Sequence, residues 1–307
     1  IDFPKKGVTK ITTSKDQVEY FDSILISKQV KKINKIKYDF DLCLVMGWAA
    51  ARVAYLAGLN YIIFFMGGDI MTPPFEKNTT LSYLKEPTFQ KNFIERKFYR
   101  KILDSAVACI VGTNEYYNKL KKFRDDAIRF DFPIVDTELF NPNIKPINMP
   151  KKKFTFLSAQ RFGLEKGFDI IWEALKLCKS DFEFLQVQWF IEKTTIEDPQ
   201  NVGDINKKLL KEIPKQVKFI PLIKRSDIGA YFMYADAIFG QVRSGAQGGI
   251  ERDAAYCKKP VISFTDPNRP QIVNGKKIIP PFLPQSNDPI ELAKIIDLVV
   301  NSKQFRE

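Results

Sequence analysis

Short apolar runs alternate with longer amphipathic stretches along this chain of 307 residues. The runs are rich in Val, Ile and Phe and are bounded by Gly, Pro, Asp or Asn, a pattern that predicts β-strands. They lie at 42–46, 61–66, 107–112, 128–130, 154–158, 184–191, 217–220, 237–242 and 260–264. The stretches between them predict helices at 15–36, 49–58, 89–104, 114–123, 167–179, 203–212, 226–234, 247–257 and 288–301. This alternation predicts an α/β fold in which helices cover both faces of parallel sheets.

A proline-rich segment interrupts the alternation near the middle of the chain. Residues 141–152 contain three prolines and no apolar periodicity, which is typical of a linker. We therefore predict a first doubly wound domain over 1–143, a linker over 144–152 and a second doubly wound domain over 153–307. Open parallel sheets bind ligands at the carboxyl ends of their strands, so we expect the functional site in a cleft between the two domains.

The chain contains no histidine, which excludes several kinds of site. A Ser-His-Asp triad, a Cys-His dyad, a histidine general base and a His-ligated zinc are all ruled out. The cysteines are far apart and form no C-x-x-C pair, as expected of buried free thiols in a reducing compartment. No apolar run reaches the ~20 residues needed to span a membrane. We therefore expect a cytoplasmic protein whose chemistry uses carboxylates, cations, hydroxyls or backbone N–H groups.

The net charge of +12 indicates a basic surface and leaves its partner open. Lysines gather at 28–37, 119–122 and 151–153. Such clusters can attract nucleic acid or anionic lipid headgroups, or they can form an ordinary solvated surface. The chain has no helix-turn-helix, RNP or zinc-finger pattern beside them. An anionic membrane surface or an anionic substrate is therefore preferred to nucleic acid.

Two cations follow the strand predicted at 154–158. Arg161 and Lys166 come after that strand, and Gly167 and an amphipathic helix follow them. Cations at the carboxyl end of a strand, next to a helix N-terminus, can form an anion site. Arginine grips two phosphate oxygens at once, whereas lysine acts as a point charge. The alternative is a loop with two solvated charges.

A loop of small residues follows the strand predicted at 237–242. It consists of Ser244, Gly245, Ala246, Gln247, Gly248 and Gly249. Its glycines allow backbone N–H groups to approach a ligand closely. Glu251 lies in the first turn of the next helix, where it can accept hydrogen bonds from a sugar diol or simply stabilise the helix dipole.

In this order and spacing, these features resemble the C-terminal domain of the retaining glycosyltransferases of family 4. That family has the GT-B fold, in which two Rossmann-like doubly wound domains face each other across a cleft. The resemblance implies that Arg161 and Lys166 bind the donor diphosphate and that Glu251 binds the donor ribose. It also implies that the backbone of Ser244, Gly245, Ala246 and Gln247 binds the distal phosphate and the sugar.

The first half of the chain resembles the family in outline and departs from it in detail. Residues 61–70 look like the family's strand with an H-G-x-D turn, but Met66 replaces the histidine. Asp69 remains, and it is expected either to orient a sugar in catalysis or to close a turn. Gly67 and Gly68 would then lie on the acceptor side. The family's first strand and its final crossing helix are not recognisable, so the chain looks truncated at both ends or is a compact member.

The second half also departs from the family, because Arg243 stands where the family has a glutamate that contacts the donor sugar. Either Arg243 pairs with an acidic group on that sugar, or catalysis has been lost and only binding remains.

The function implied by the resemblance is transfer of a sugar, with retention, from a nucleoside diphosphate sugar to a hydroxyl of a glycan or lipid-linked acceptor. No cofactor and no metal are expected, since two cations neutralise the phosphates. The basic helix at 28–37 could meet either an anionic lipid surface at the inner face of the membrane or a lipid-linked acceptor. Two alternatives remain: an impaired GT-B protein that binds a nucleotide or sugar, and a basic protein that binds nucleic acid or a membrane surface.

Overall fold

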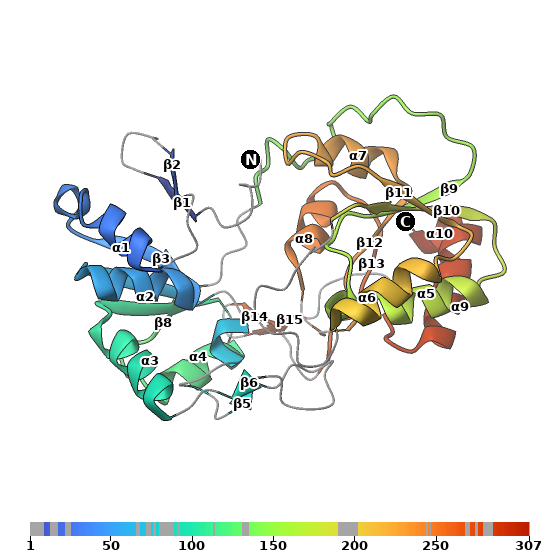
Figure 1. Ribbon diagram of the computed structural model, residues 1–307. Helices are drawn as coiled ribbons and strands as arrows, with labels where there is room; N and C mark the ends of the chain where they lie inside the picture. Colours follow the sequence, from blue (N-terminus) through green and yellow to red (C-terminus); the bar gives the residue numbers. More distant parts are fainter. Residues whose placement is uncertain are drawn as a thin grey trace. The chain divides into compact units, whose positions relative to one another are not determined.

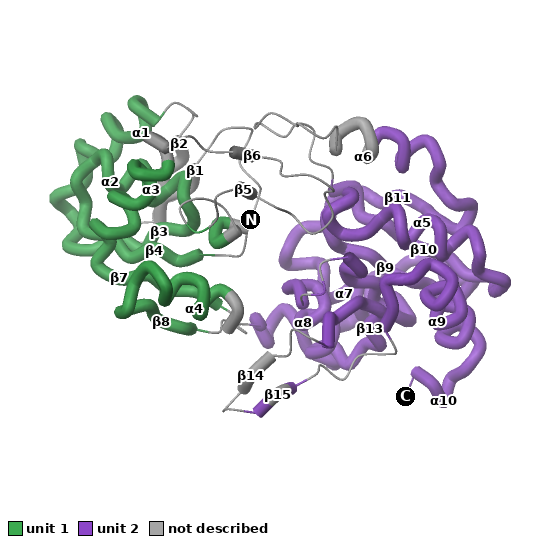
Figure 2. Tube along the Cα trace, turned by 90° about the horizontal axis from the view of Figure 1, so that it is seen from below, with its two compact units in different colours: residues 1–81, 86–132 green, residues 82–85, 133–307 purple. Residues whose placement is uncertain are grey.

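A computed structural model gives the fold of the chain in two compact units. It describes residues 9–12, 18–21, 26–65, 68–71, 75, 78–79, 89–90, 93–112, 114–130, 135–189, 202–243, 245, 247–267, 271–273, 276–278 and 285–306. Unit 1 comprises Ile1–Leu81 with Glu86–Phe132, and unit 2 comprises Ser82–Lys85 with Pro133–Glu307 (Figure 2). Each unit has its own parallel sheet and its own core.

The sheet of unit 1 has four parallel strands in the order β3-β4-β7-β8. These strands are β3 (Cys43–Met46), β4 (Tyr61–Phe65), β7 (Ala108–Val111) and β8 (Ile128–Arg129). Its helices are α1 (Ile26–Ile33), α2 (Gly47–Ala57), α3 (Phe93–Ser105) and α4 (Asn114–Lys121). Ile63 and Cys109 are paired across β4 and β7, and both are fully buried against Ala51 and Ile102 of the helices. Leu44 and Met46 point to the other face of the sheet, where they are exposed.

Shorter elements complete unit 1 and correct the starts of two predicted helices. The structure pairs β1 (Thr9–Thr12) with β2 (Val18–Phe21) and β5 (Asn78–Thr79) with β6 (Phe89–Gln90), both antiparallel. The helix predicted over 89–104 is wrong at its start, because β6 covers Phe89–Gln90 and α3 begins at Phe93. The helix predicted over 15–36 is also wrong in its first part, and α1 begins only at Ile26. The physical reason is that Val-Glu-Tyr-Phe has the β-branched and aromatic residues that favour an extended strand. Of two 3-10 helices, η1 (Lys37–Asp39) precedes β3 in the chain and η2 (Gly68–Met71) follows β4.

The sheet of unit 2 has five parallel strands in the order β11-β10-β9-β12-β13. Its strands are β9 (Phe154–Ser158), β10 (Phe182–Val187), β11 (Val217–Ile220), β12 (Ala237–Phe239) and β13 (Val261–Ile262). Its helices are α5 (Phe168–Leu177), α6 (Val202–Lys211), α7 (Ile228–Tyr234), α8 (Gly249–Tyr256), α9 (Pro289–Asn301) and α10 (Lys303–Arg306). A short antiparallel pair joins β14 (Gln271–Val273) to β15 (Lys276–Ile278). The chain order reverses between β9 and β12, which is the topological switch point of a doubly wound sheet.

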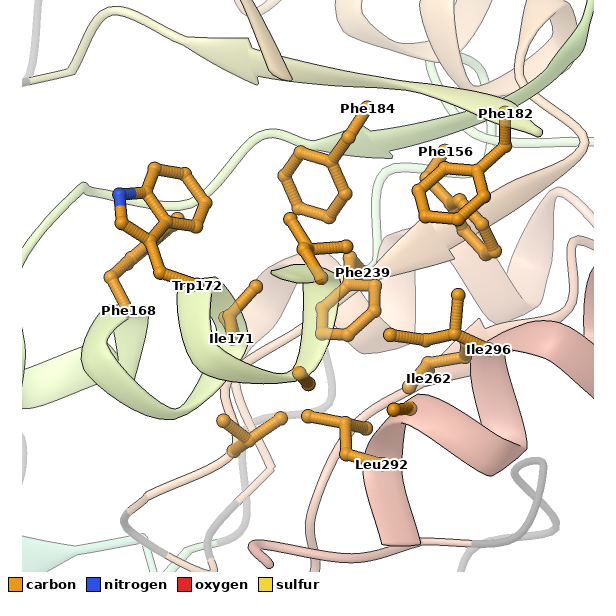
Figure 3. Close-up of a cluster of buried hydrophobic side chains, with 14 of the residues drawn as sticks. Phe156, Phe168, Ile171, Trp172, Phe182, Phe184, Phe239, Ile262, Leu292 and Ile296 are labelled. Atoms are coloured by element: carbon orange, nitrogen blue, oxygen red, sulfur yellow. The ribbon is translucent and has the colours of Figure 1, made fainter. Parts of the chain in front are cut away.

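Alternate residues of these strands enter two separate cores. Phe156 of β9 packs with Phe184, Phe239 and Trp172 on the face covered by α5, α6 and α9 (Figures 1 and 3). The next residue, Leu157, points to the opposite face, where α7 and α8 pack. This two-residue period is that of a strand buried on both faces. The expected parallel sheet with helices on both faces is present in unit 2.

The segment before β9 belongs to unit 2, and the division of the chain lies upstream of the predicted linker. Phe140 is fully buried, with its ring centroid 5.9 Å from that of Phe232. The Arg225 guanidinium lies 4.7 Å from the centroid of the Phe140 ring. The Tyr234 hydroxyl donates to the Pro150 carbonyl oxygen at 3.1 Å. The prolines stop regular secondary structure here, but the aromatic side chain still fixes the segment to the core.

No helix in the described part of the chain combines the length and the apolarity that crossing a lipid bilayer requires.

Replacing Phe140 by Ala should lower the free energy of unfolding of unit 2 by about 3–5 kcal/mol, because losing a buried ring leaves a cavity. Urea unfolding followed by tryptophan fluorescence measures the change, with Ile290→Ala as the control. Ile290 is 59% exposed, so its truncation should change stability little. Similar losses for both variants would contradict the packing described for Phe140.

Candidate functional site

The turn after β9 brings two cations to the carboxyl edge of the unit 2 sheet. The 3-10 helix η3 (Leu164–Lys166) ends at Gly167, which has φ 84°, and α5 follows directly. A Cβ at Gly167 would lie 2.7 Å from Val242 Cγ2. Both the left-handed backbone and the close approach therefore require glycine at this position.

Arg161 is held by a carboxylate of the same turn. Its Nε donates to Glu165 Oε1 at 2.7 Å. The Arg161 side chain is 36% exposed, whereas that of Glu165 is only 15% exposed. Gly163 has no side chain that would collide with the Glu165 carboxylate. The turn thus fixes the guanidinium at one end while leaving part of its surface in contact with solvent.

Lys166 reaches across to the end of β12. Its Nζ donates to Gln241 Oε1 at 3.1 Å. Burial is the main cause that lowers the pKa of Lys166 below its ordinary value of 10.5. The Glu251 carboxylate acts in the opposite direction, and the Arg161 charge adds to the lowering. A half-buried ammonium close to a second cation is well suited to hold an anion.

Glu251 is a buried carboxylate at the start of α8. The residue is only 2% exposed, and its Oε1 accepts a hydrogen bond from the Gln241 backbone N–H at 2.9 Å. The Ser263 hydroxyl lies 3.5 Å from the same oxygen. Gly240 and Gly248 leave room for this carboxylate, since a Cβ at either residue would come within 2.5 Å of it. The carboxylate is therefore fixed between the ends of β12, β13 and α8.

The small-residue loop before α8 is described in part. Ser244 and Ala246 lie outside the described residues. Gly245 has φ 66°, and its carbonyl accepts from the Asp266 N–H at 2.9 Å. Gln247 is half-buried, and the N-cap residue Gly248 makes no side-chain cap. Backbone N–H groups at such a helix start can bind an anion.

Arg243 has partners within its own unit. Its Nε donates to the Leu164 carbonyl oxygen at 2.9 Å, and its guanidinium forms an ion pair with Asp169 of α5. Its side chain is 19% exposed. An acidic group on a donor sugar would therefore have to compete with an existing ion pair for this guanidinium.

Asp69 of unit 1 lies in η2, beyond the carboxyl end of β4. The Trp48 indole Nε1 donates to the Asp69 carbonyl oxygen at 2.9 Å. Gly47 begins α2 with φ 70°, and a Cβ there would lie 3.0 Å from Asp69 Oδ1. The carboxylate therefore lies against the start of a helix, where a negative charge is favourable. Gly68 begins η2, and the predicted acceptor-side Gly67 and neighbouring Met66 lie outside the described residues.

Several polar residues at the carboxyl edge of unit 2 were not predicted from the sequence. Gln160 Nε2 donates to the Gly240 carbonyl at 2.8 Å, and Gln186 Nε2 donates to the Gln160 carbonyl at 3.1 Å. The Gln241 side chain accepts a hydrogen bond from Lys166, and the Ser263 hydroxyl donates one to Glu251. The sequence signal that could have identified them is a polar side chain at, or just beyond, the end of an otherwise apolar strand.

The basic clusters differ in how far they are neutralised. Lys151 pairs with Asp236 at 2.8 Å and Lys153 pairs with Asp181 at 2.6 Å, so the cluster at 151–153 presents little net charge. On α1, Lys28 and Lys31 are exposed. The part of the chain that the structure describes contains no group of three or more carboxylates or cysteines arranged to hold a metal.

Comparison with known proteins identifies the family. Residues 140–307 match the model of glycosyl transferases group 1, which is more than half of the chain, so the chain belongs to this family. No curated protein matches the chain.

Solved structures show the fold. Anabaena HepE, solved with UDP and glucose, is 16% identical with a TM-score of 0.59, over 92% of this chain and 74% of that one. A UDP-forming α,α-trehalose-phosphate synthase from Burkholderia xenovorans is 10% identical with a TM-score of 0.62, over 91% and 71%. A Rickettsia africae glycosyltransferase is 18% identical with a TM-score of 0.53, over 94% and 73%. The predicted GT-B fold, with two Rossmann-like domains, is confirmed.

Replacing Gly240 by Ala should displace the Glu251 carboxylate, because the new Cβ would lie 2.5 Å from Glu251 Cγ and Oε1. We expect a loss of about 1–3 kcal/mol in unfolding free energy, as is typical when a group is forced into a packed interior. Gly249→Ala is the matched control, since a Cβ there would meet no further atom of the described residues within 4 Å beyond its chain neighbours and its own helix backbone. Thermal unfolding compares the two, and equal stability would contradict the tight enclosure of Glu251.

Proposed function

We propose that the chain is a retaining glycosyltransferase that moves a sugar from a nucleoside diphosphate sugar to a hydroxyl of a glycan or lipid-linked acceptor. The observation that carries the proposal is the grouping of Arg161, Lys166 and Glu251 at the carboxyl edge of the unit 2 sheet, with Lys166 and Glu251 both contacting Gln241. One carboxylate and two cations at a switch point suit a ligand with a diol at one end and two phosphates at the other.

Each group has a separate role in this proposal. Arg161 and Lys166 bind the diphosphate together with backbone N–H groups of Ser244, Gly245, Ala246 and Gln247. Glu251 accepts hydrogen bonds from the ribose hydroxyls, and its fixed position reduces the entropy lost on binding. HepE was solved with UDP-glucose, which makes a uridine nucleotide the first donor to test.

The chemistry asked of the protein is mainly electrostatic. The diphosphate gains negative charge as the bond to the sugar breaks, and the sugar passes through an oxocarbenium-like state. A pre-positioned donor facing such charge typically contributes ~3–4 kcal/mol. A donor phosphate oxygen takes the proton of the acceptor hydroxyl, so no histidine is needed. We assign neither a metal nor a cofactor to the reaction.

The acceptor side is proposed to lie in unit 1, where Asp69 orients a sugar hydroxyl beside Gly67 and Gly68. The exposed lysines of α1 would meet an anionic membrane surface on its cytoplasmic side or an anionic lipid-linked acceptor. A trehalose-phosphate synthase of the same fold was solved with glucose-6-phosphate, which is consistent with a sugar or sugar phosphate as acceptor.

A panel of nucleoside diphosphates and their sugars, assayed by thermal shift, tests the donor assignment. A ligand at 100 times its Kd adds about 2.7 kcal/mol of stability. Arg161→Ala and Glu251→Gln should lose most of the shift, whereas Lys153→Ala, at the opposite end of β9, should keep it. A full shift in both site variants would refute the assignment.

Turnover separates the enzyme from its main rival. Nuclear magnetic resonance of the anomeric proton should report retention with the donor that binds best. Nucleotide binding without turnover for any acceptor would favour the impaired binding protein, for which the replacement of the family's glutamate by Arg243 is the motivating observation.

Diphosphate affinity should fall with rising pH before an ordinary lysine would lose its proton. Burial lowers the pKa of Lys166 below 10.5, and only its charged form attracts phosphate. In Lys166→Arg the guanidinium stays charged, so the affinity should remain flat over the same range. Calorimetric titration with UDP between about pH 7 and 10 measures how the affinity changes with pH in the wild type and in Lys166→Arg. Parallel slopes would exclude Lys166 as a phosphate ligand.

A further inference from the structure

The segment after β12 is joined to the turn after β9 by a group of contacts that we call the β12–η3 junction. Its members are the 241–243 segment on one side and the 164–169 segment on the other. The Val242 N–H donates to the Lys166 carbonyl at 3.2 Å. The Lys166 ammonium returns a hydrogen bond to Gln241 Oε1 at 3.1 Å. Lys166 is therefore bound through both its backbone and its side chain.

Arg243 closes this junction at its outer end. Its guanidinium joins the Leu164 carbonyl, at the start of η3, to the Asp169 carboxylate, in the first turn of α5. These two partners stand on either side of Lys166 and Gly167. The backbone N of Arg243 would lie only 3.2 Å from a Cβ at Gly167, so the two segments are packed closely.

The ion pair cannot be broken without cost. Asp169 Oδ1 is buried and has no hydrogen-bond partner among the described residues. The ion pair with Arg243 is made by the other oxygen, Oδ2. Removing the guanidinium would leave the partly buried Asp169 carboxylate without its ion-pair partner. Because an unpaired buried charge is costly, the first turn of α5 would then tend to move so that water can reach the carboxylate.

We propose that Arg243 is a positioning residue: it holds the Leu164–Asp169 turn so that Lys166 faces the donor diphosphate, and it does not contact the donor sugar. The inference rests on the proposed function, because the diphosphate is the ligand assigned to Lys166. It differs from the sequence-based hypothesis, in which Arg243 pairs with an acidic sugar. A misplacement of about 1 Å at a binding group can have a large effect on function.

Hydrogen exchange without ligand tests the junction itself. The segment 162–171 should exchange faster in Arg243→Gln and in Asp169→Asn than in the wild type. The double variant should exchange no faster than either single variant, since both break the same contact. Arg306→Gln is the control, because Arg306 donates to the Val299 and Val300 carbonyls elsewhere in unit 2. Unchanged exchange in both junction variants would overturn the proposal.

Binding of inorganic pyrophosphate tests the consequence for the ligand. Pyrophosphate contains no sugar, so if Arg243 acted only at the sugar, its replacement would leave the Kd for pyrophosphate unchanged. An unchanged Kd in Arg243→Gln would therefore overturn the proposal. Positioning predicts a Kd that is about three- to tenfold higher in Arg243→Gln and also in Asp169→Asn. Arg243→Lys, which keeps the charge, should recover part of the affinity.

The Asp169→Asn variant separates positioning from long-range charge. Removing a carboxylate from a phosphate site should tighten anion binding if only charge matters. Weaker binding in this variant supports positioning, and tighter binding overturns it. If the wild type binds neither pyrophosphate nor any nucleoside diphosphate, the proposed function fails and the diphosphate role of Arg243 fails with it. The exchange experiment still reports separately whether the junction holds the turn.

Discussion

The parallel pairing of β9 with β12 decides where every polar group of the unit 2 site lies. Leu157 is in register with Ile238, so the chain leaves both strands at the same edge of the sheet. Gln160 then bonds to Gly240, and Lys166 bonds to Gln241. Residues some 80 positions apart become neighbours because the order of the strands reverses at this point. The aromatic core beneath the strands gives that edge a rigid base.

Charge at this edge is balanced locally. Arg161 has Glu165, Arg243 has Asp169, and the Lys166 charge lies close to Glu251. Such partners hold the cations in place before any ligand arrives, which lowers the entropy cost of binding. The same carboxylates also compete with an anionic ligand for these cations. An anionic ligand therefore binds to cations that are already held in position and that remain in contact with these carboxylates.

The sequence pattern predicted the parallel strands of both sheets well, because buried parallel strands produce short apolar runs with clear ends. It missed the short antiparallel pairs β1–β2, β5–β6 and β14–β15. It also predicted that Arg161, Lys166 and Glu251 follow strands or begin a helix, and the structure has all three at one edge of unit 2. It failed where tertiary contacts decide. Phe140 is buried within a proline-rich stretch, and the Arg243–Asp169 pair joins residues far apart in sequence.

The position of the tryptophans has a practical consequence. Trp48 is the one tryptophan of unit 1, and Trp172 and Trp189 belong to unit 2. The Trp48 indole is hydrogen-bonded to Asp69, whereas the Trp172 indole donates to Leu209 in the core of unit 2. Each unit thus carries its own fluorophore. Replacing Trp48 by Phe makes unit 2 visible alone, and the difference spectrum reports the surroundings of Asp69 without any added label.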